Sequence, residues 1–265
     1  MKRRKSIGSA RALSAVVVAA TLMVSSVLYA AGGGGADLES PRIDTSNQKS
    51  LQRGAQTFVN YCMGCHSAGY HRYNRLAADL GLSEADVVEN LILTTDESGE
   101  RTKVGALMTN NMTEDYGKQA FGVVPPNLTL TARSRGVDWI YSYMKSFYLD
   151  PERAGVGVNN TVYPGAAMPH VLWEQQGWQK AVYKEVERDG EMHKEFDKFE
   201  QLTPGTHTTD EYDQLITDLT NFLAYVADPG KHQRHRIGMY VMIFLLFLTG
   251  IAYLLKQEYW KDIEH

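Results

Sequence analysis

Two cysteines and a histidine stand close together in the first quarter of the chain, in the order Cys62-Met63-Gly64-Cys65-His66. Two thiols separated by two residues, with a histidine directly after the second, form the attachment sequence for a c-type haem. Each sulfur can add to one haem vinyl group as a thioether, and the adjacent imidazole can bind the iron. The motif therefore predicts a covalently held haem c, with His66 as an axial ligand.

Other uses of a Cys-x-x-Cys pair fit this sequence less well. A zinc site needs further ligands, and the chain has no other cysteines to supply them. A thioredoxin-like dithiol belongs between a strand and a helix, and no βαβ pattern surrounds the motif. A disulfide across two intervening residues would be strained. None of these alternatives requires the histidine, so the haem interpretation is favoured.

A second iron ligand is expected from residues 162–170, which read VYPGAAMPH. Met168 stands there among small residues and beside a proline, so its thioether can approach iron without steric conflict. Such a ligand favours ferrous iron and raises the reduction potential. The poorer candidates are Met192 in a charged stretch, Met108 and Met112 on a polar loop, and Met239 and Met242 in the membrane segment. The alternative ligands His170, His193 and His207 would give bis-histidine ligation at a lower potential.

The loop-rich residues 110–130 and the arginines after them are predicted to border the haem. Pro125 and Pro126 force an extended, rigid backbone that can line the edge of a pocket, with a plain rigid loop as the alternative. Arg133 and Arg135 follow, and a guanidinium fork suits bidentate pairing with a propionate carboxylate. Surface solvation is the alternative for each arginine, and we expect it for at least one of them.

Two stretches far apart in the chain have the apolar spacing of helices that can hold the motif. Residues 50–61 run directly into it. Residues 208–227 form the last soluble segment, and Thr208 with Glu211 makes a capping box at its start. Gly54 lies on the apolar stripe of the first helix, where it either lets another helix cross closely or is merely tolerated. We expect the two helices to pack across each other around the haem.

Shorter elements are expected in the rest of the soluble part. Residues 83–93 begin with a capping box and residues 137–148 are rich in aromatic side chains, so both are predicted helices. Residues 173–201 are dense in charge, and we interpret them as one or two surface helices, either solvated or docking a basic partner. His71 is expected at the surface or beside a propionate, because His66 has the better claim to iron. No β-rich pattern is apparent, so a mainly α fold is predicted.

Residues 1–30 have the pattern of a secretory signal peptide, in which cations precede an uncharged run that ends in small residues. An uncleaved membrane anchor is the alternative, since the run is long enough to span a bilayer. The whole chain has a formal charge of −4, and loss of the five cations in this segment, which has no acid, leaves −9. An acidic exported protein is a poor match for nucleic acid and a good match for a basic protein.

Residues 237–255 form a run of 19 residues without a charge. As a helix they would extend roughly 28 Å, about the hydrocarbon thickness of a bilayer. A buried core helix is the alternative. Cations lie on both sides of the run, so the positive-inside rule does not decide its orientation. We therefore infer the orientation from the signal peptide. We expect the soluble body, residues 31–236, outside and the tail, residues 256–265, in the cytoplasm.

The chain resembles the cytochrome c1 family, the haem-bearing subunits of the quinol–cytochrome c reductase (cytochrome bc1) complex. The motif CMGCH alone marks only a c-type cytochrome, but three later stretches in this order are more specific. They are PPNLTLTARSR at 125–135, YPGAAMP at 163–169 and DLTNFLAYVADPGKHQRHRIGM at 218–239. The resemblance covers essentially the whole mature chain.

The resemblance implies a class I cytochrome c-like haem domain with long loop insertions, plus one C-terminal transmembrane helix. It also implies a single-pass protein of the bacterial inner membrane with its haem domain in the periplasm. By position, Cys62 and Cys65 carry the thioethers and His66 and Met168 bind the iron. Pro126 and Arg133 are the further residues of the cofactor site that it implies, Arg133 as a partner of a propionate. Ala120-Phe121-Gly122 replaces the Asn-Gly of some members, so their amide contact to the haem is not carried over.

The implied function is outer-sphere electron transfer, with no catalysis by the isolated chain. The implied partners are cytochrome b, the Rieske iron–sulfur protein, a soluble or membrane-bound c-type cytochrome and the lipid bilayer, within a dimeric complex. Two alternatives differ in kind. One is a membrane-anchored shuttle cytochrome outside that complex, and the other is an enzyme or gas sensor with an open haem site.

Overall fold

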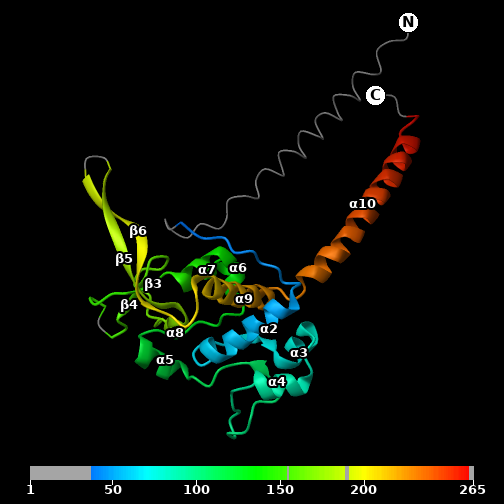
Figure 1. Ribbon diagram of the computed structural model, residues 1–265. Helices are drawn as coiled ribbons and strands as arrows, with labels where there is room; N and C mark the ends of the chain where they lie inside the picture. Colours follow the sequence, from blue (N-terminus) through cyan, green and yellow to red (C-terminus); the bar gives the residue numbers. More distant parts are fainter. Residues whose placement is uncertain (1–36, 154, 189–190, 263–265) are drawn as a thin grey trace. The chain divides into compact units, whose positions relative to one another are not determined.

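The computed structural model describes residues 37–153, 155–188 and 191–262, so the predicted signal peptide lies outside the described residues. Within these ranges helices predominate and the strands form small two-stranded sheets, which confirms a mainly α fold (Figure 1). The first half contains α2 (Gln48–Thr57), the π-helix η1 (Phe58–Cys62), β1 (Ala68–Arg72), α3 (Tyr73–Leu80), α4 (Glu84–Asn90), β2 (Leu107–Met108) and α5 (Glu114–Phe121). The second half contains α6 (Thr131–Ser134), α7 (Val137–Lys145), β3 (Phe147–Leu149), β4 (Val158–Asn160), α8 (Trp173–Gln176), β5 (Gly177–Arg188), β6 (Glu191–Pro204), α9 (Thr209–Ala227) and α10 (Lys231–Tyr259).

Two helices from opposite ends of the soluble part, α2 and α9, pack directly against each other (Figure 1). A Cβ atom on Gly54 would lie 2.0 Å from the backbone oxygen of Asp218 and 2.7 Å from Cβ of Phe222. Because both distances are too short for real atoms, only glycine allows the two backbones to approach so closely. The predicted helix crossing is confirmed, and the idea that Gly54 is merely tolerated is wrong.

A buried carboxylate fastens the same crossing. Asp218 on α9 is 2% exposed and accepts hydrogen bonds from Nε and Nη2 of Arg53 on α2, at 2.6 and 3.0 Å. Ser50 Oγ donates to it at 2.6 Å and Gln214 Nε2 at 3.0 Å. Donors from both helices therefore satisfy the charge, which is the condition under which a carboxylate can be buried without a large cost.

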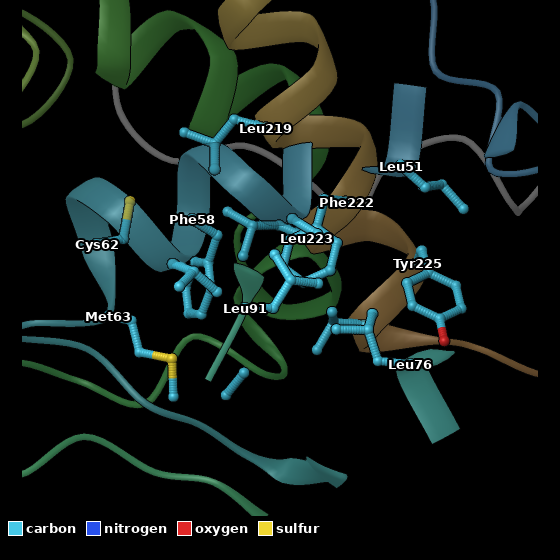
Figure 2. Close-up of a cluster of buried hydrophobic side chains, with 14 of the residues drawn as sticks. Leu51, Phe58, Cys62, Met63, Leu76, Leu91, Leu219, Phe222, Leu223 and Tyr225 are labelled. Carbon is cyan, nitrogen blue, oxygen red and sulfur yellow. The ribbon is translucent and has the colours of Figure 1, made fainter. Parts of the chain in front are cut away.

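The apolar core continues from this crossing to the haem motif. Figure 2 shows side chains of α9, including Phe222 and Leu223, beside Phe58 of η1, and the two phenyl rings lie 5.5 Å apart. The helix widens into a π-helical turn here, and the amide of Met63 donates to the carbonyl of Phe58 at 2.9 Å. Because η1 follows α2 without a break, the core fixes the position from which Cys62 leaves it.

Residues 173–201, predicted as one or two surface helices, instead form mainly a β-hairpin. Only α8 is helical, and β5 and β6 pair antiparallel along their whole length. Charges that suggested a helix surface pair across the strands, as Lys180–Glu200, Lys184–Asp197 and Arg188–Glu195. In the sequence an Asp-Gly pair separates the two strands, and this is a strong hairpin signal. The helix prediction was wrong because a high density of charge suits both a solvated helix and a charged hairpin, and only the turn residues distinguish the two.

The other soluble elements are confirmed with shifted ends. The predicted capping boxes are present at the starts of α4 and α9. Residues 137–148 form α7, but the helix ends at Lys145 and Phe147 already belongs to β3. The loop-rich residues 110–130 also contain the short helix α5, which Thr113 caps.

The predicted span at 237–255 lies entirely within α10, a continuous helix of 29 residues. Its length and composition suit one membrane crossing, and none of its most apolar window is buried by the described residues, unlike a core helix. At the start of α10, Nη1 and Nη2 of Arg234 donate to the carboxylate of Asp228 at 2.8 and 2.6 Å. This bidentate pair ties α10 to the end of α9.

His71, expected at the surface or beside a propionate, is 4% exposed and lies in the core beside α9. The hydroxyl of Tyr225 donates to Asp79 at 2.8 Å, so its oxygen is left to accept from Nε2–H of His71 at 3.1 Å. The surface prediction was wrong because β1 turns this side chain inward, which the sequence around it does not reveal.

We expect Gly54→Ala to lower the free energy of unfolding by about 1–3 kcal/mol. The new methyl group meets the backbone of α9, and this clash outweighs the roughly 1 kcal/mol that alanine gains in a helix. Urea unfolding of the detergent-solubilised, haem-loaded chain would measure the change. Gly105→Ala is the matched control, because a Cβ there meets nothing within 4 Å. Equal stability of the two variants would contradict the close crossing.

Stability should also depend on pH through His71. Burial lowers the pKa of His71 to about 4, with Arg75 adding to the fall and Asp79 opposing it. The folded state therefore favours the neutral ring, and its stabilisation is complete above pH 6.5 and is lost as pH falls from 6.5 toward 4. Between pH 7 and pH 4.5 we expect the wild type to lose about 2–3 kcal/mol more than His71→Gln. Parallel losses in the two proteins would refute this role.

Candidate haem site

A cleft opens beside the cysteine motif. Its walls come from the end of η1 with the residues after it, from the segment after α5, and from residues 161–169, here called the Met168 loop. The lining residues are Tyr61, Cys62, Cys65, His66, Phe121, Val123, Pro125, Pro126, Ala167, Met168, Pro169 and Val171. A mostly apolar lining with a few placed donors is typical of a cofactor site.

A hydrogen bond to the backbone orients the ring of His66. Its Nδ1 lies 2.8 Å from the carbonyl oxygen of Pro126. Because a carbonyl only accepts, Nδ1 carries the proton and Nε2 keeps a free lone pair. Burial lowers the pKa of His66, which also favours the neutral ring that binds metals. Pro126 thus supports the ligand as well as lining the cleft, an arrangement common behind metal-bound histidines.

The two cysteines lie within one helical turn of the point where the chain emerges from the apolar core. Cys62 is buried at the end of η1, Cys65 is half-buried, and the amide of His66 donates to the carbonyl of Cys62 at 2.8 Å. Both thiols line the cleft and are not joined in a disulfide. Burial raises the pKa of the Cys62 thiol to about 12. Among the described residues no group of three or more His, Cys, Asp or Glu side chains gathers as a metal site, so the zinc alternative gains no support.

Met168 lies half-buried in the cleft wall and packs against the main core. It reaches this position from a loop rather than a helix, more than a hundred residues after His66. The other proposed ligands do not line the cleft. His170 is buried behind the loop, His193 is exposed on β6, and His207 lies on the connection into α9. The geometry therefore favours Met168 over the bis-histidine alternatives.

The two arginines after the proline pair lie outside the cleft lining. Arg133 is exposed on α6, and its charge contributes to lowering the pKa of Asp228. Arg135 lies over the rings of Trp139 and Tyr163, at 5.2 and 5.9 Å from their centroids. Arg135 thus has aromatic partners, and the role of Arg133 toward a propionate stays a prediction.

Sequence reasoning missed part of the cleft wall. Tyr61, Phe121, Val123, Ala167 and Val171 line the cleft but were not predicted as site residues. Three of them directly flank predicted residues in the sequence, which was an available signal. Phe121, the last residue of α5, and Val123 just after it lie in the loop-rich stretch 110–130, but no local pattern marks either of them individually.

The donors present fit a haem c. Two thiols, one imidazole nitrogen and one thioether line a single apolar cleft, and the hydrogen bond at Pro126 leaves the imidazole nitrogen ready for a metal. These are the groups that tether a porphyrin and occupy the two axial positions of its iron. Tyr61 also lines the cleft, and its hydroxyl oxygen accepts a hydrogen bond from Nε2 of Gln175 at 2.8 Å.

Comparison with known proteins agrees with this geometry. The model of the Cytochrome C1 family matches residues 40–263. The chain belongs to the cytochrome c1 family. It is 48% identical to cytochrome c1 of Allochromatium vinosum over 86% of this chain and 91% of the relative. It is 41% identical to a protein of Nitrosomonas europaea named ammonia monooxygenase gamma subunit, over 85% and 88% of the two chains. Mitochondrial cytochrome c1 of Saccharomyces cerevisiae is 28% identical over 83% of this chain and 69% of the relative.

Membership of the cytochrome c1 family makes this chain a haem subunit of the bc1 type of electron-transfer complex. It also agrees with a c-type haem domain joined to one long apolar C-terminal helix. All four residues expected to hold the haem lie inside the matched range.

Replacing the proposed thioether ligand should change the spectrum of the haem-loaded chain. In Met168→Leu we expect loss of the weak near-infrared band of sulfur ligation and a fall in reduction potential of about 100 mV or more, because a thioether favours ferrous iron. Met192→Leu, on the exposed face of β6, is the control and should leave both unchanged. An unaltered spectrum and potential in Met168→Leu would exclude Met168 as the ligand.

Proposed function

We propose that this subunit accepts one electron from the Rieske iron–sulfur protein and passes it to a soluble or membrane-bound c-type cytochrome. The observation that carries the proposal is the shared cleft, where His66 and Met168 lie with Cys62 and Cys65. A haem tethered there has a protein donor for each axial position, so no coordination site is left for a substrate. Such a group supplies reversible one-electron exchange when bound.

The chain's own residues hold, orient and enclose the group. Cys62 and Cys65 would tether it covalently, and the carbonyl of Pro126 fixes the plane and tautomer of His66. The apolar side chains of the cleft exclude water, which together with a thioether ligand raises a haem potential. We keep Arg133 as the propionate partner, because it follows the prolines of the cleft wall and has no side-chain hydrogen bond among the described residues.

We propose that residues 1–30 direct export, residues 31–236 lie in the periplasm, residues 237–255 cross the bacterial inner membrane and residues 256–265 remain in the cytoplasm. The continuous apolar helix α10 supports one crossing, and the bacterial relatives support this membrane. An anchored haem domain stays beside cytochrome b in the bilayer and within reach of a mobile Rieske domain, in a dimeric complex.

The charge of the exported part suits a basic electron acceptor. Without residues 1–30 the chain changes from −4 to −9, since that segment holds five cations and no acid. Opposite net charges attract the two proteins and accelerate their encounter at low ionic strength. This attraction weakens as salt screens the charges. Electron transfer to the acceptor should therefore slow as salt concentration rises.

Purification from native membranes tests the proposed function. We expect this chain to co-purify with cytochrome b and a Rieske protein, and its haem to be reduced within the complex when a quinol is added. Complexes depleted of the Rieske protein should lose at least about 90% of the rate of that reduction, because they lack the electron donor. Complexes containing Rieske protein that has been re-added serve as the control.

Three outcomes would overturn the proposal. Recovery of the chain without cytochrome b would favour a membrane-anchored shuttle cytochrome. Recovery with a different enzyme in place of cytochrome b would indicate another assembly. This outcome is included because one relative is named ammonia monooxygenase gamma subunit. Rapid binding of carbon monoxide by the ferrous wild type would indicate an open iron site, as in an enzyme or gas sensor.

A further inference from the structure

The two ends of the Met168 loop join the buried part of the domain at the same place. It starts after Asn160, the last residue of β4, and ends before His170. These two residues are 0% and 4% exposed, whereas four of the nine loop residues between them are exposed. Both contact the junction between α7 and β3, at Ser146 and Phe147. The loop is therefore closed at its base by buried contacts to two neighbouring residues.

The side-chain amide of Asn160 makes the first closure. Its oxygen accepts from Ser146 Oγ at 2.9 Å and from the amides of Val162 and Tyr163 at 2.9 and 3.0 Å. Its nitrogen donates to the carbonyl of Tyr143 at 2.8 Å. One buried side chain thus joins the start of the loop to the end of α7, with both of its polar atoms satisfied.

The ring of His170 makes the second closure. It stacks on Phe147 with centroids 5.1 Å apart and an interplanar angle of 6°, and it meets the edge of Trp178 at 5.9 Å. Among the described residues neither ring nitrogen has a hydrogen-bond partner of normal geometry, although the side chain of Gln176 lies close to the ring. His170 therefore holds its place mainly by aromatic contact, which is favourable beyond the area it buries.

Two further contacts stiffen the loop between its ends. The side-chain oxygen of Asn159 accepts from the amide of Gly165 at 2.8 Å, and Nη2 of Arg153 donates to the carbonyl of Ala166 at 2.8 Å. Gly165 has φ of +82°, a conformation that favours glycine. The backbone just before Met168 is thereby fixed from the outside of the loop.

We propose that Asn160 and His170 are positioning residues that clamp the two ends of the Met168 loop and so keep the thioether at the iron. This inference rests on the proposed ligation by Met168. A thioether is a weak ligand, and an external ligand can bind iron only in the fraction of molecules whose loop has opened. Its apparent dissociation constant is therefore raised by the rarity of the open state. Loosening either end of the loop should increase that fraction without touching the haem.

Imidazole binding to the ferric, detergent-solubilised full chain tests the clamp. Loss of a buried hydrogen-bonding hub should favour the open loop, so in Asn160→Ala we expect the apparent dissociation constant to fall roughly tenfold or more. Ser146→Ala removes one of the bonds to Asn160, together with a longer bond to the carbonyl of Tyr143, and should lower it by about fivefold. Asn221→Ala is the matched control, because Asn221 is an equally buried asparagine that binds Ser50 and Asp44 in the helix crossing. It should stay within about twofold of wild type.

Substitutions of His170 test the aromatic end of the clamp. His170→Phe keeps a flat ring and should retain wild-type imidazole affinity and near-infrared absorption, whereas His170→Ala should bind imidazole more tightly and weaken that absorption. A merely structural role would lower the melting temperature without this pattern of rescue. If Asn160→Ala and Asn221→Ala changed imidazole binding equally, the clamp would be wrong. A wild-type chain without the near-infrared band would instead overturn the ligation by Met168 and the proposed function.

Discussion

The contact between the backbones of α2 and α9 is the constraint on which the rest of the structure depends. At Gly54 the two helices are so close that no side chain fits between them. At the same point Asp218 is bound by donors from both helices, so neither can rotate or slide without unpairing a buried charge. Because η1 continues α2 without a break, this crossing also decides where Cys62 and His66 emerge. A feature of helix packing thus sets the position of the chemistry.

The other half of the site is built in a different way. His66 belongs to a segment held by the core, and the carbonyl of Pro126 orients its ring. Met168 lies on a loop whose conformation depends on hydrogen bonds and ring contacts at the loop's base. The imidazole is a strong ligand that needs orientation, whereas the thioether is a weak one that needs preorganisation. The supporting structure around each proposed ligand agrees with this difference.

The sequence was informative where covalent chemistry or helical periodicity dictates residue types. The haem motif, the Met168 segment and the faces of α2 and α9 could therefore be predicted. The sequence was uninformative where the residue that a side chain contacts lies far along the chain. Nothing near His71 shows that Tyr225 covers it, and nothing near Asn160 shows that it bonds to Ser146. The hairpin of β5 and β6 was missed for a different reason, since cross-strand ion pairs and the charges of a solvated helix look alike in a linear sequence.

A closed iron site, as proposed above, would call for partner proteins rather than a bound substrate. An open site needs a free coordination position and a path to it, but here the two proposed axial donors belong to segments anchored by buried contacts. Electrons alone can pass such a boundary, so the remaining requirement is to bring the cofactor close to its donor and acceptor. The single span meets that requirement, because α10 follows α9 directly and Arg234 ties the two together through Asp228. The crossing that positions the haem motif is thereby linked, through one helix, to the membrane in which the complex assembles.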